Sequence, residues 1–255
     1  MKGPTLIGIV VLALTLTACT ENLDPCARVS QIPRSECGAL VEFYEATDGG
    51  NWKDRRGWVE GSRPCEWHGV ECDGGHVSSI SLNYNELRGT LPISLSELPH
   101  LRTLSLYFNH LGGDIPSEYG QLENLEVLIL HNNELEGRIP DEFANLGSLK
   151  KLDLDSNNIG GEIPPGLGNL PELEELLLRG NELSGPIPPE LGGLSNLRGL
   201  FLSNNNLTGN IPPELGNLTH LKMLSLYGNE LTGSVPSVFL GIPSSGYDLL
   251  EWGDD

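Results

Sequence analysis

The chain has 255 residues with 35 acidic and 15 basic side chains, a formal net charge of -20 at pH 7. Because phosphate binding depends on clustered lysine and arginine, this balance argues against nucleic acid as a partner. Glycine and proline contribute 32 and 18 residues, unusually many for a compact helical enzyme, and the composition excludes a polytopic membrane protein, a coiled coil and a collagen.

The N-terminus has the pattern of an export signal, which we assign to residues 1–18. A basic start precedes an apolar run, Leu6 to Leu16, that is too short to span a bilayer of about 30 Å as a helix. The run closes with Leu16-Thr17-Ala18-Cys19, which resembles the lipobox of bacterial lipoproteins. The resemblance implies a lipid on Cys19 and an exported protein tethered to a bacterial envelope, at the outer membrane or cell surface. An ordinary cleavable signal is the alternative.

Four cysteines remain once Cys19 is assigned to lipid. An even number in an exported chain favours two disulfides. Proximity favours pairing Cys26 with Cys37 and Cys65 with Cys72, although three connectivities are formally possible. Zinc is the rival interpretation, but spacings of ten and six intervening residues suit it poorly. Residues 19–37 are expected to form a tether with one disulfide.

The next segment, residues 38–76, is expected to cover the end of a repeat domain. Within it, Ala39–Thr47 predicts a short amphipathic helix with Leu40, Phe43 and Tyr44 on the buried side.

Seven units of 24 residues then follow without an insertion over residues 77–244. They start at Val77, Leu101, Leu125, Leu149, Leu173, Leu197 and Leu221. Each follows L-x-x-L-x-L-x-x-N-x-L-x-G-x-I-P-x-x-L-G-x-L-x-x, of which the first half is the leucine-rich repeat pattern. The I-P half resembles the plant-type subclass of these repeats. The resemblance implies an α/β solenoid, a right-handed superhelix with a parallel sheet on its concave face and short second strands and 3-10 turns on its other sides.

The segment before the repeats carries a related resemblance. Cys65-Glu66-Trp67-His68-Gly69-Val70-Glu71-Cys72 is similar to the N-terminal cap of plant-type repeats. This implies a bond between Cys65 and Cys72, with Trp67 packed on the first coil. The acidic C-terminal tail, residues 245–255, lacks a plant-type cysteine pair, and Leu249, Leu250 and Trp252 are the candidates to close the last coil.

The repeated residues have structural roles. Leucines at the fourth and sixth positions, such as Leu176 and Leu178, are expected to point inward while the fifth, such as Leu177, faces out. An asparagine at the ninth position is expected to be buried and to satisfy backbone groups where the chain turns. This asparagine ladder is Asn85, Asn109, Asn133, Asn157, Asn181, Asn205 and Asn229. A single unit cannot bury enough apolar surface to fold alone, so the units must stack.

The candidate binding surface is the outward side of the strands, at positions three, five, seven and eight of each unit. These positions vary while the inward ones repeat, as in a scaffold that carries a recognition surface. The alternative is that they only stabilise the strands. The candidate residues are Tyr84, Tyr107, Phe108, Val127, Ile129, His131, Asp153, Asp155, Leu177, Arg179, Phe201, Met223 and Tyr227.

Catalytic motifs are not found, and no cofactor or metal is expected. A calcium loop at Asp153-x-Asp155-x-Asn157 lacks its closing glutamate, and a hydrolase that uses Asp153 or Asp155 is the enzymatic alternative. We therefore expect a non-enzymatic, monomeric, lipid-tethered protein that binds a protein or glycan ligand. A secreted inhibitor of a cell-wall-degrading enzyme, similar to polygalacturonase inhibitors, or a protein resembling a receptor ectodomain is the alternative.

Two Asn-x-Thr motifs occur, at Asn206-Leu207-Thr208 and Asn217-Leu218-Thr219. They would be glycosylated in a eukaryotic secretory pathway, but on a bacterial lipoprotein we expect them to be unmodified.

Overall fold

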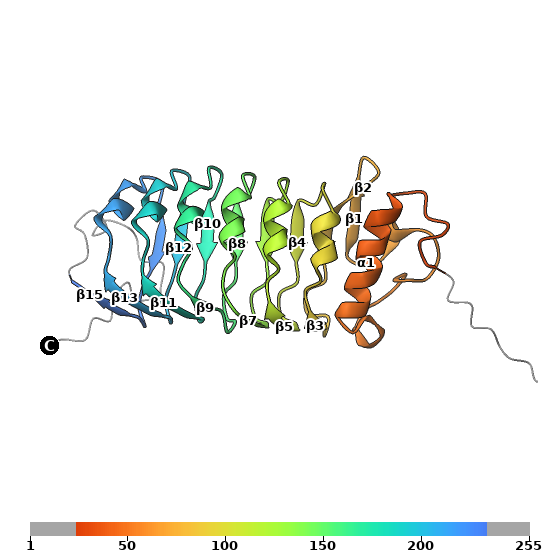
Figure 1. Cartoon of the computed structure of the whole chain (residues 1–255), viewed down its shortest axis with the longest axis horizontal. Coiled ribbons are helices and arrows are strands. Elements are labelled where there is room, and N and C mark those ends of the chain that lie inside the picture. Colours follow the sequence, from red (N-terminus) through yellow and green to blue (C-terminus); the bar gives the residue numbers. More distant parts are fainter. Residues whose placement is uncertain (1–23, 234–255) are drawn as a thin grey trace, which may run out of the picture.

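The computed structural model describes residues 24–233, which form an elongated stack of coils (Figure 1). The predicted signal peptide, the lipid attachment at Cys19, the end of the seventh repeat and the predicted C-terminal cap with Leu249, Leu250 and Trp252 lie outside the described residues. Within residues 24–233, no helix combines the length and the apolar character needed to cross a membrane.

One strand from each of the seven repeats and β1 from the cap form an eight-stranded sheet of order β1-β2-β4-β6-β8-β10-β12-β14. The strands are Val70–Asp73 (β1), His76–Ser81 (β2), Thr103–Ser105 (β4), Val127–Ile129 (β6), Lys151–Asp153 (β8), Glu175–Leu177 (β10), Gly199–Phe201 (β12) and Met223–Ser225 (β14). β1 pairs antiparallel with β2, and from β2 onward neighbouring strands are parallel. The constant 24-residue period places equivalent positions side by side, as with Leu128 opposite Leu152.

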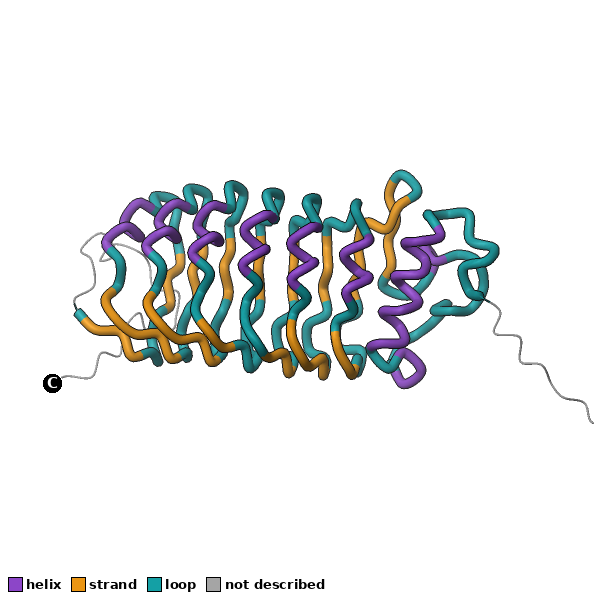
Figure 2. Tube along the Cα trace, in the orientation of Figure 1, coloured by secondary structure: helices purple, strands orange, loops and turns teal. Residues whose placement is uncertain are grey.

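The other sides of each coil carry a second strand and a 3-10 helix (Figure 2). The second strands, in two smaller parallel sheets, are Arg88–Thr90 (β3), His110–Asp114 (β5), Glu134–Glu136 (β7), Gly160–Gly161 (β9), Glu182–Pro186 (β11), Asn206–Asn210 (β13) and Glu230–Thr232 (β15). The 3-10 helices of the repeats are Ile93–Glu97 (η3), Ser117–Gln121 (η4), Asp141–Asn145 (η5), Pro165–Asn169 (η6), Pro189–Gly193 (η7) and Pro213–Asn217 (η8). Each of these helices follows the repeat's proline, which suits a helix start because it lacks a donor. The predicted solenoid is confirmed.

The asparagine ladder hydrogen-bonds each coil to the one before it. Asn133 Nδ2 donates to the carbonyl oxygens of Leu106 at 3.0 Å and Leu130 at 2.9 Å, and Asn133 Oδ1 accepts the Leu111 N–H at 3.0 Å. The same three contacts recur at Asn109, Asn157, Asn181, Asn205 and Asn229. Asn85 instead pairs with the backbone of Asp54, so the ladder also ties the first coil to the cap.

The cap helix is longer than the sequence predicted. α1 spans Arg34–Ala46, so the predicted start at residue 39 and end at residue 47 are wrong. Its first turn is held by contacts remote in sequence: the buried Glu36 carboxylate accepts the Val77 N–H at 2.8 Å and lies 2.6 Å from His76 Nδ1. The helix therefore continues through residue 37, where the tether was expected to end.

Two disulfides and an aromatic cluster complete the cap. The bonds join Cys26 to Cys37 and Cys65 to Cys72, the pairs that proximity favoured. Trp58 is fully buried, with its ring centroid 4.9 Å from that of Trp52 and 5.0 Å from that of Trp67. Phe43 and Tyr44 pack against the same rings, Phe43 fully buried and Tyr44 half-buried. Two more short 3-10 helices, Gly49–Asn51 (η1) and Pro64–Glu66 (η2), connect these elements.

Candidate functional site

The strand face does not expose the predicted binding residues equally. Tyr84 and Phe108 are exposed, at 56% and 43%. Eight others are half-buried: Tyr107, Val127, Ile129, His131, Arg179, Phe201, Met223 and Tyr227. The expectation that Leu177, Asp153 and Asp155 are exposed is wrong, because these side chains retain only 9%, 4% and 7% of their accessible surface.

Neighbouring strands cover these three residues. Parallel strands place one residue of each coil beside its equivalents, and side chains in such a column cover one another. Leu177 therefore lies between Asp153 on β8 and Phe201 on β12. The middle of the face is a filled ribbon of side chains rather than a row of free anchors.

The charged groups of the face are paired across strands. Asp155 accepts the Arg179 backbone N–H at 2.7 Å and the Arg179 Nε at 2.7 Å, and the guanidinium stacks on Phe201 at 4.8 Å. Lys151 Nζ lies 2.6 Å from Glu175, and His131 Nδ1 lies 2.9 Å from Asp153. Burial raises the pKa of the Asp155 carboxyl, an effect that the Arg179 guanidinium partly offsets. Both carboxylates offered for hydrolytic chemistry therefore already have cationic or hydrogen-bonding partners.

Four aromatic side chains gather at the N-terminal end of the face and form what we call the aromatic patch: Tyr84, Tyr107, Phe108 and His131. The Tyr84 and Phe108 rings stack with centroids 4.5 Å apart and an interplanar angle of 10°. Tyr107 stacks on His131 at 4.6 Å and meets Tyr84 edge-on at 5.3 Å. Aromatic pairs in these geometries hold one another in place, so the patch presents rigid ring surfaces to solvent.

The backbone beneath the exposed rings has an unusual conformation. The eighth residue of every repeat has positive φ, between 53° and 66°, and we call this set the left-handed column: Tyr84, Phe108, Asn132, Ser156, Gly180, Asn204 and Gly228. Glycine and asparagine adopt this region readily, whereas a bulky side chain there is a conformational outlier. Four coils use glycine or asparagine, the fourth coil uses Ser156, and the first two use tyrosine and phenylalanine.

This difference within one chain points to a use for the rings. All seven coils require the same backbone turn, so the fold accepts an unstrained residue at this position. The aromatic side chains at Tyr84 and Phe108 cost conformational free energy and remain exposed. Strain of this kind is typically found at functional positions.

The left-handed column separates two hollows that share Phe108, Asn132 and Ser156. One, of about 450 Å³, lies over the strands and reaches Arg179 and Tyr227. The other, of about 470 Å³, lies beyond the column towards the second strands. Sequence analysis missed its other lining residues, which include Lys53, Glu86, His110 and Glu134. The sequence carried one indication of the left-handed column that the two hollows share: asparagine and glycine recur at the eighth position of the repeat.

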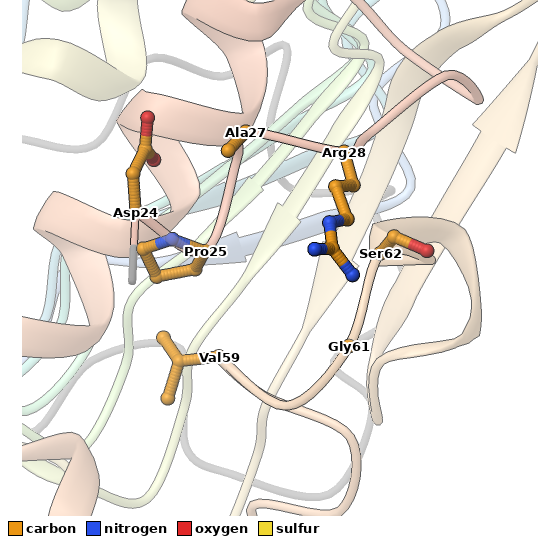
Figure 3. Close-up of a pocket in the computed structure, with 7 residues that line it drawn as sticks. All are labelled: Asp24, Pro25, Ala27, Arg28, Val59, Gly61 and Ser62. Atoms are coloured by element: carbon orange, nitrogen blue, oxygen red, sulfur yellow. The ribbon is translucent and has the colours of Figure 1, made fainter. Parts of the chain in front are cut away.

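A further hollow, of about 350 Å³, lies in the cap, and none of the predicted binding residues of the strand face lines it. Figure 3 shows the side chains around it, among them Pro25, Arg28 and Val59. Val59 has a φ of 52°, an outlier for a β-branched residue. Over residues 24–233, no group of three or more histidine, cysteine, aspartate or glutamate side chains is arranged to hold a metal ion.

Family models match most of the described chain. The model for the leucine-rich repeat region matches residues 83–208, a two-copy leucine-rich repeat model matches residues 195–237, and the leucine-rich repeat N-terminal domain matches residues 34–73. No curated protein sequence matches the chain.

Solved structures extend these matches. Pollen receptor kinase 3 is 37% identical, with a TM-score of 0.67, and the match covers 76% of this chain and 95% of that one. The ectodomain of the Arabidopsis receptor kinase HAESA, in complex with an extended IDA peptide hormone, is 36% identical with a TM-score of 0.73, and PEPR1 with AtPEP1 is 33% identical with a TM-score of 0.75. The chain belongs to the leucine-rich repeat family. The HAESA match covers 80% of this chain and 35% of the receptor chain; the PEPR1 match covers 81% and 30%.

The comparisons overturn the predicted location. The similar structures include ectodomains of plant receptor kinases, and this chain has a leucine-rich repeat N-terminal domain with two disulfides. These findings contradict a lipid-anchored location in a bacterial envelope. The lipobox resemblance rested on four residues outside the described range, whereas the receptor likeness rests on the folded domain.

Proposed function

We propose that this chain is a secreted or cell-surface recognition protein that binds a peptide or an extended protein segment on its concave strand face. Adjacent strands pack about 4.8 Å apart, and helical turns need more room, so the strand side is the inner side of the curve. A partner on this surface contacts several coils at once. HAESA, which shares this architecture, is solved with a peptide hormone bound.

The observation that carries the proposal is the pair of exposed rings on left-handed backbone, Tyr84 and Phe108. Exposed aromatic side chains with few freely rotating bonds bury a large area at low entropic cost, which makes them suitable interface anchors. The paired charges farther along the face contribute orientation and selectivity rather than net attraction, because each already has a partner.

A displayed library of random linear peptides, selected on the full chain, tests this function. The variant Tyr84→Asn/Phe108→Asn removes both rings and substitutes the residue that the same column uses at Asn132 and Asn204. We expect selected peptides to lose at least about tenfold in affinity, equivalent to about 1.4 kcal/mol.

The matched control is Ile93→Asn. Ile93 is as exposed as Tyr84, at 56%, but lies in η3 on the helical side. Its replacement should leave peptide binding unchanged. The proposal fails if no peptide family is selected, or if selected peptides bind the double variant as tightly as the parent chain. A glycan array probed with the same proteins tests the glycan alternative, and inhibition of cell-wall-degrading enzymes tests the inhibitor alternative.

A further inference from the structure

The corrected location changes the meaning of two sequence motifs that the binding function leaves unused. Asn206-Leu207-Thr208 and Asn217-Leu218-Thr219 have the acceptor pattern for N-linked glycosylation. Their expected lack of modification depended on a bacterial envelope, which the receptor likeness contradicts.

The fold presents both acceptor asparagines to solvent. Asn206 begins β13 and Asn217 ends η8, and both side chains are exposed. The middle residue of each motif points inward, with Leu207 fully buried and Leu218 5% exposed. Burial of these leucines leaves the flanking asparagine and threonine on the outer surface, so a bulky hydrophilic group on either asparagine displaces no core residue.

The two sites lie in one coil, away from the aromatic patch. Both belong to the sixth repeat, with Asn206 on the second-strand side and Asn217 on the helical side. The aromatic patch belongs to the first three repeats, three to five coils away, or roughly 15 to 25 Å at about 4.8 Å per strand. Glycans at these positions would cover the flanks near the C-terminal end and leave the strand face open.

We propose that Asn206 and Asn217 are N-glycosylation sites of the secreted chain. In the transfer, the asparagine Nδ2 attacks the anomeric carbon of a lipid-linked oligosaccharide diphosphate. A carbon–nitrogen bond forms, the carbon–oxygen bond to the diphosphate breaks, Nδ2 loses one proton and the lipid diphosphate leaves. This inference rests on the proposed secreted or cell-surface location of the chain, but not on which ligand the concave face binds.

Other exposed asparagines of the repeats serve as internal controls. Asn158 occupies the position of Asn206 in the fourth repeat, but Gly160 stands where the threonine would be. Asn145 and Asn169 end η5 and η6 as Asn217 ends η8, and they are followed by Leu-Gly and Leu-Pro. All three are exposed, as Asn206 and Asn217 are, but lack the acceptor pattern. We therefore expect them to be unmodified.

The test is site mapping on the full chain expressed in plant cells. Digestion with a peptide-N-glycosidase in heavy-oxygen water converts each glycosylated asparagine to a labelled aspartate, which peptide mass spectrometry locates. We expect label at residues 206 and 217 and none at residues 145, 158 and 169. Thr208→Ala and Thr219→Ala should each remove one glycan, whereas Thr208→Ser and Thr219→Ser should retain it.

A gain-of-site variant completes the test. Gly160→Thr creates the acceptor pattern at Asn158. A Cβ at Gly160 meets only carbonyl oxygens, 3.7 and 3.8 Å away, which is ordinary van der Waals contact. Label at residue 158 in this variant shows that the host modifies this position of a coil. An unlabelled asparagine at 206 or 217 overturns the proposal for that site. Peptide binding by the deglycosylated chain should be unchanged.

Discussion

The left-handed column and the asparagine ladder are adjacent in sequence, at the eighth and ninth positions of every repeat, yet they follow different rules. The ladder is asparagine in all seven coils. In six of them the amide donates to two carbonyl oxygens and accepts a backbone N–H, as at Asn133, and in the first coil Asn85 bonds both backbone groups of Asp54. No other side chain of that size supplies this set of groups. The left-handed column is defined by a backbone angle alone, and its side chains range from glycine to tyrosine.

The comparison shows what kind of constraint makes a position informative about function. A buried hydrogen-bonding position reports on folding, because any replacement leaves backbone groups unsatisfied. An exposed position with a demanding backbone reports on function when the residue chosen there is a costly one. Tyr84 and Phe108 meet that condition, whereas Gly180 and Gly228 do not.

The largest loss of stability should come from a substitution in the core beneath the strand face, and it sets the scale for the smaller losses. Leu130, the sixth residue of the third repeat, is fully buried. Leu130→Ala should lower the free energy of unfolding by about 2 to 5 kcal/mol through lost burial and a cavity. Urea unfolding followed by circular dichroism measures it, and a loss below about 1 kcal/mol would show that the coil relaxes around the gap.

Asn133→Leu should give the next largest effect. The substitution keeps the approximate volume but leaves the Leu106 and Leu130 carbonyls and the Leu111 N–H without their partner, at a cost of about 1 to 3 kcal/mol. Its control is the adjacent Asn132→Gly, which preserves the left-handed backbone and should change the same urea midpoint little. Equal losses in the two variants would contradict the distinction between ladder and column.

A buried tyrosine extends the comparison to pH. Tyr119 is fully buried and donates to the Pro92 carbonyl at 3.0 Å, and burial raises its pKa well above 10.0. The folded chain therefore keeps this proton at pH values where the unfolded chain loses it, so stability falls as pH rises above about 10. Tyr119→Phe should lower stability by about 1 kcal/mol at neutral pH and show a shallower alkaline decline. Parallel declines of the two proteins would contradict burial of the phenol.

The smallest stability effect is expected at the aromatic patch. Phe108→Asn relieves about 1 kcal/mol of left-handed strain and loses ring contacts of about the same size. The urea midpoint should therefore remain within about 1 kcal/mol of the parent chain. A loss as large as that of Asn133→Leu would make Phe108 a structural residue and remove the observation on which the proposed binding function rests.

Much of the candidate site could be predicted from the sequence because the repeat fixes which positions share a face. Tyr84, Tyr107, Phe108 and His131 were identified in that way, and the structure brings them together. The burial of Leu177, Asp153 and Asp155 could not be predicted from the sequence. Strand alternation predicts which way a side chain leaves the backbone. Its burial depends on the side chains of neighbouring coils, such as Arg179 beside Asp155.

The cap illustrates the same limit. Helical periodicity located the buried Leu40 and Phe43 but not the first turn of α1, which is fixed by a bond from Glu36 to a strand some forty residues away. Such a contact leaves no periodic trace. The cysteine pairs were accessible by proximity because each bond closes a short loop.

By itself, the amino-acid sequence determined the solenoid, its 24-residue period and its inward leucines and asparagines, because each is repeated seven times and errors in one copy are corrected by the others. Only the tertiary structure decided which outward residues are free to bind. That property arises between coils, where stacked side chains cover Leu177 and Asp153 but leave the rings of Tyr84 and Phe108 standing on a left-handed turn.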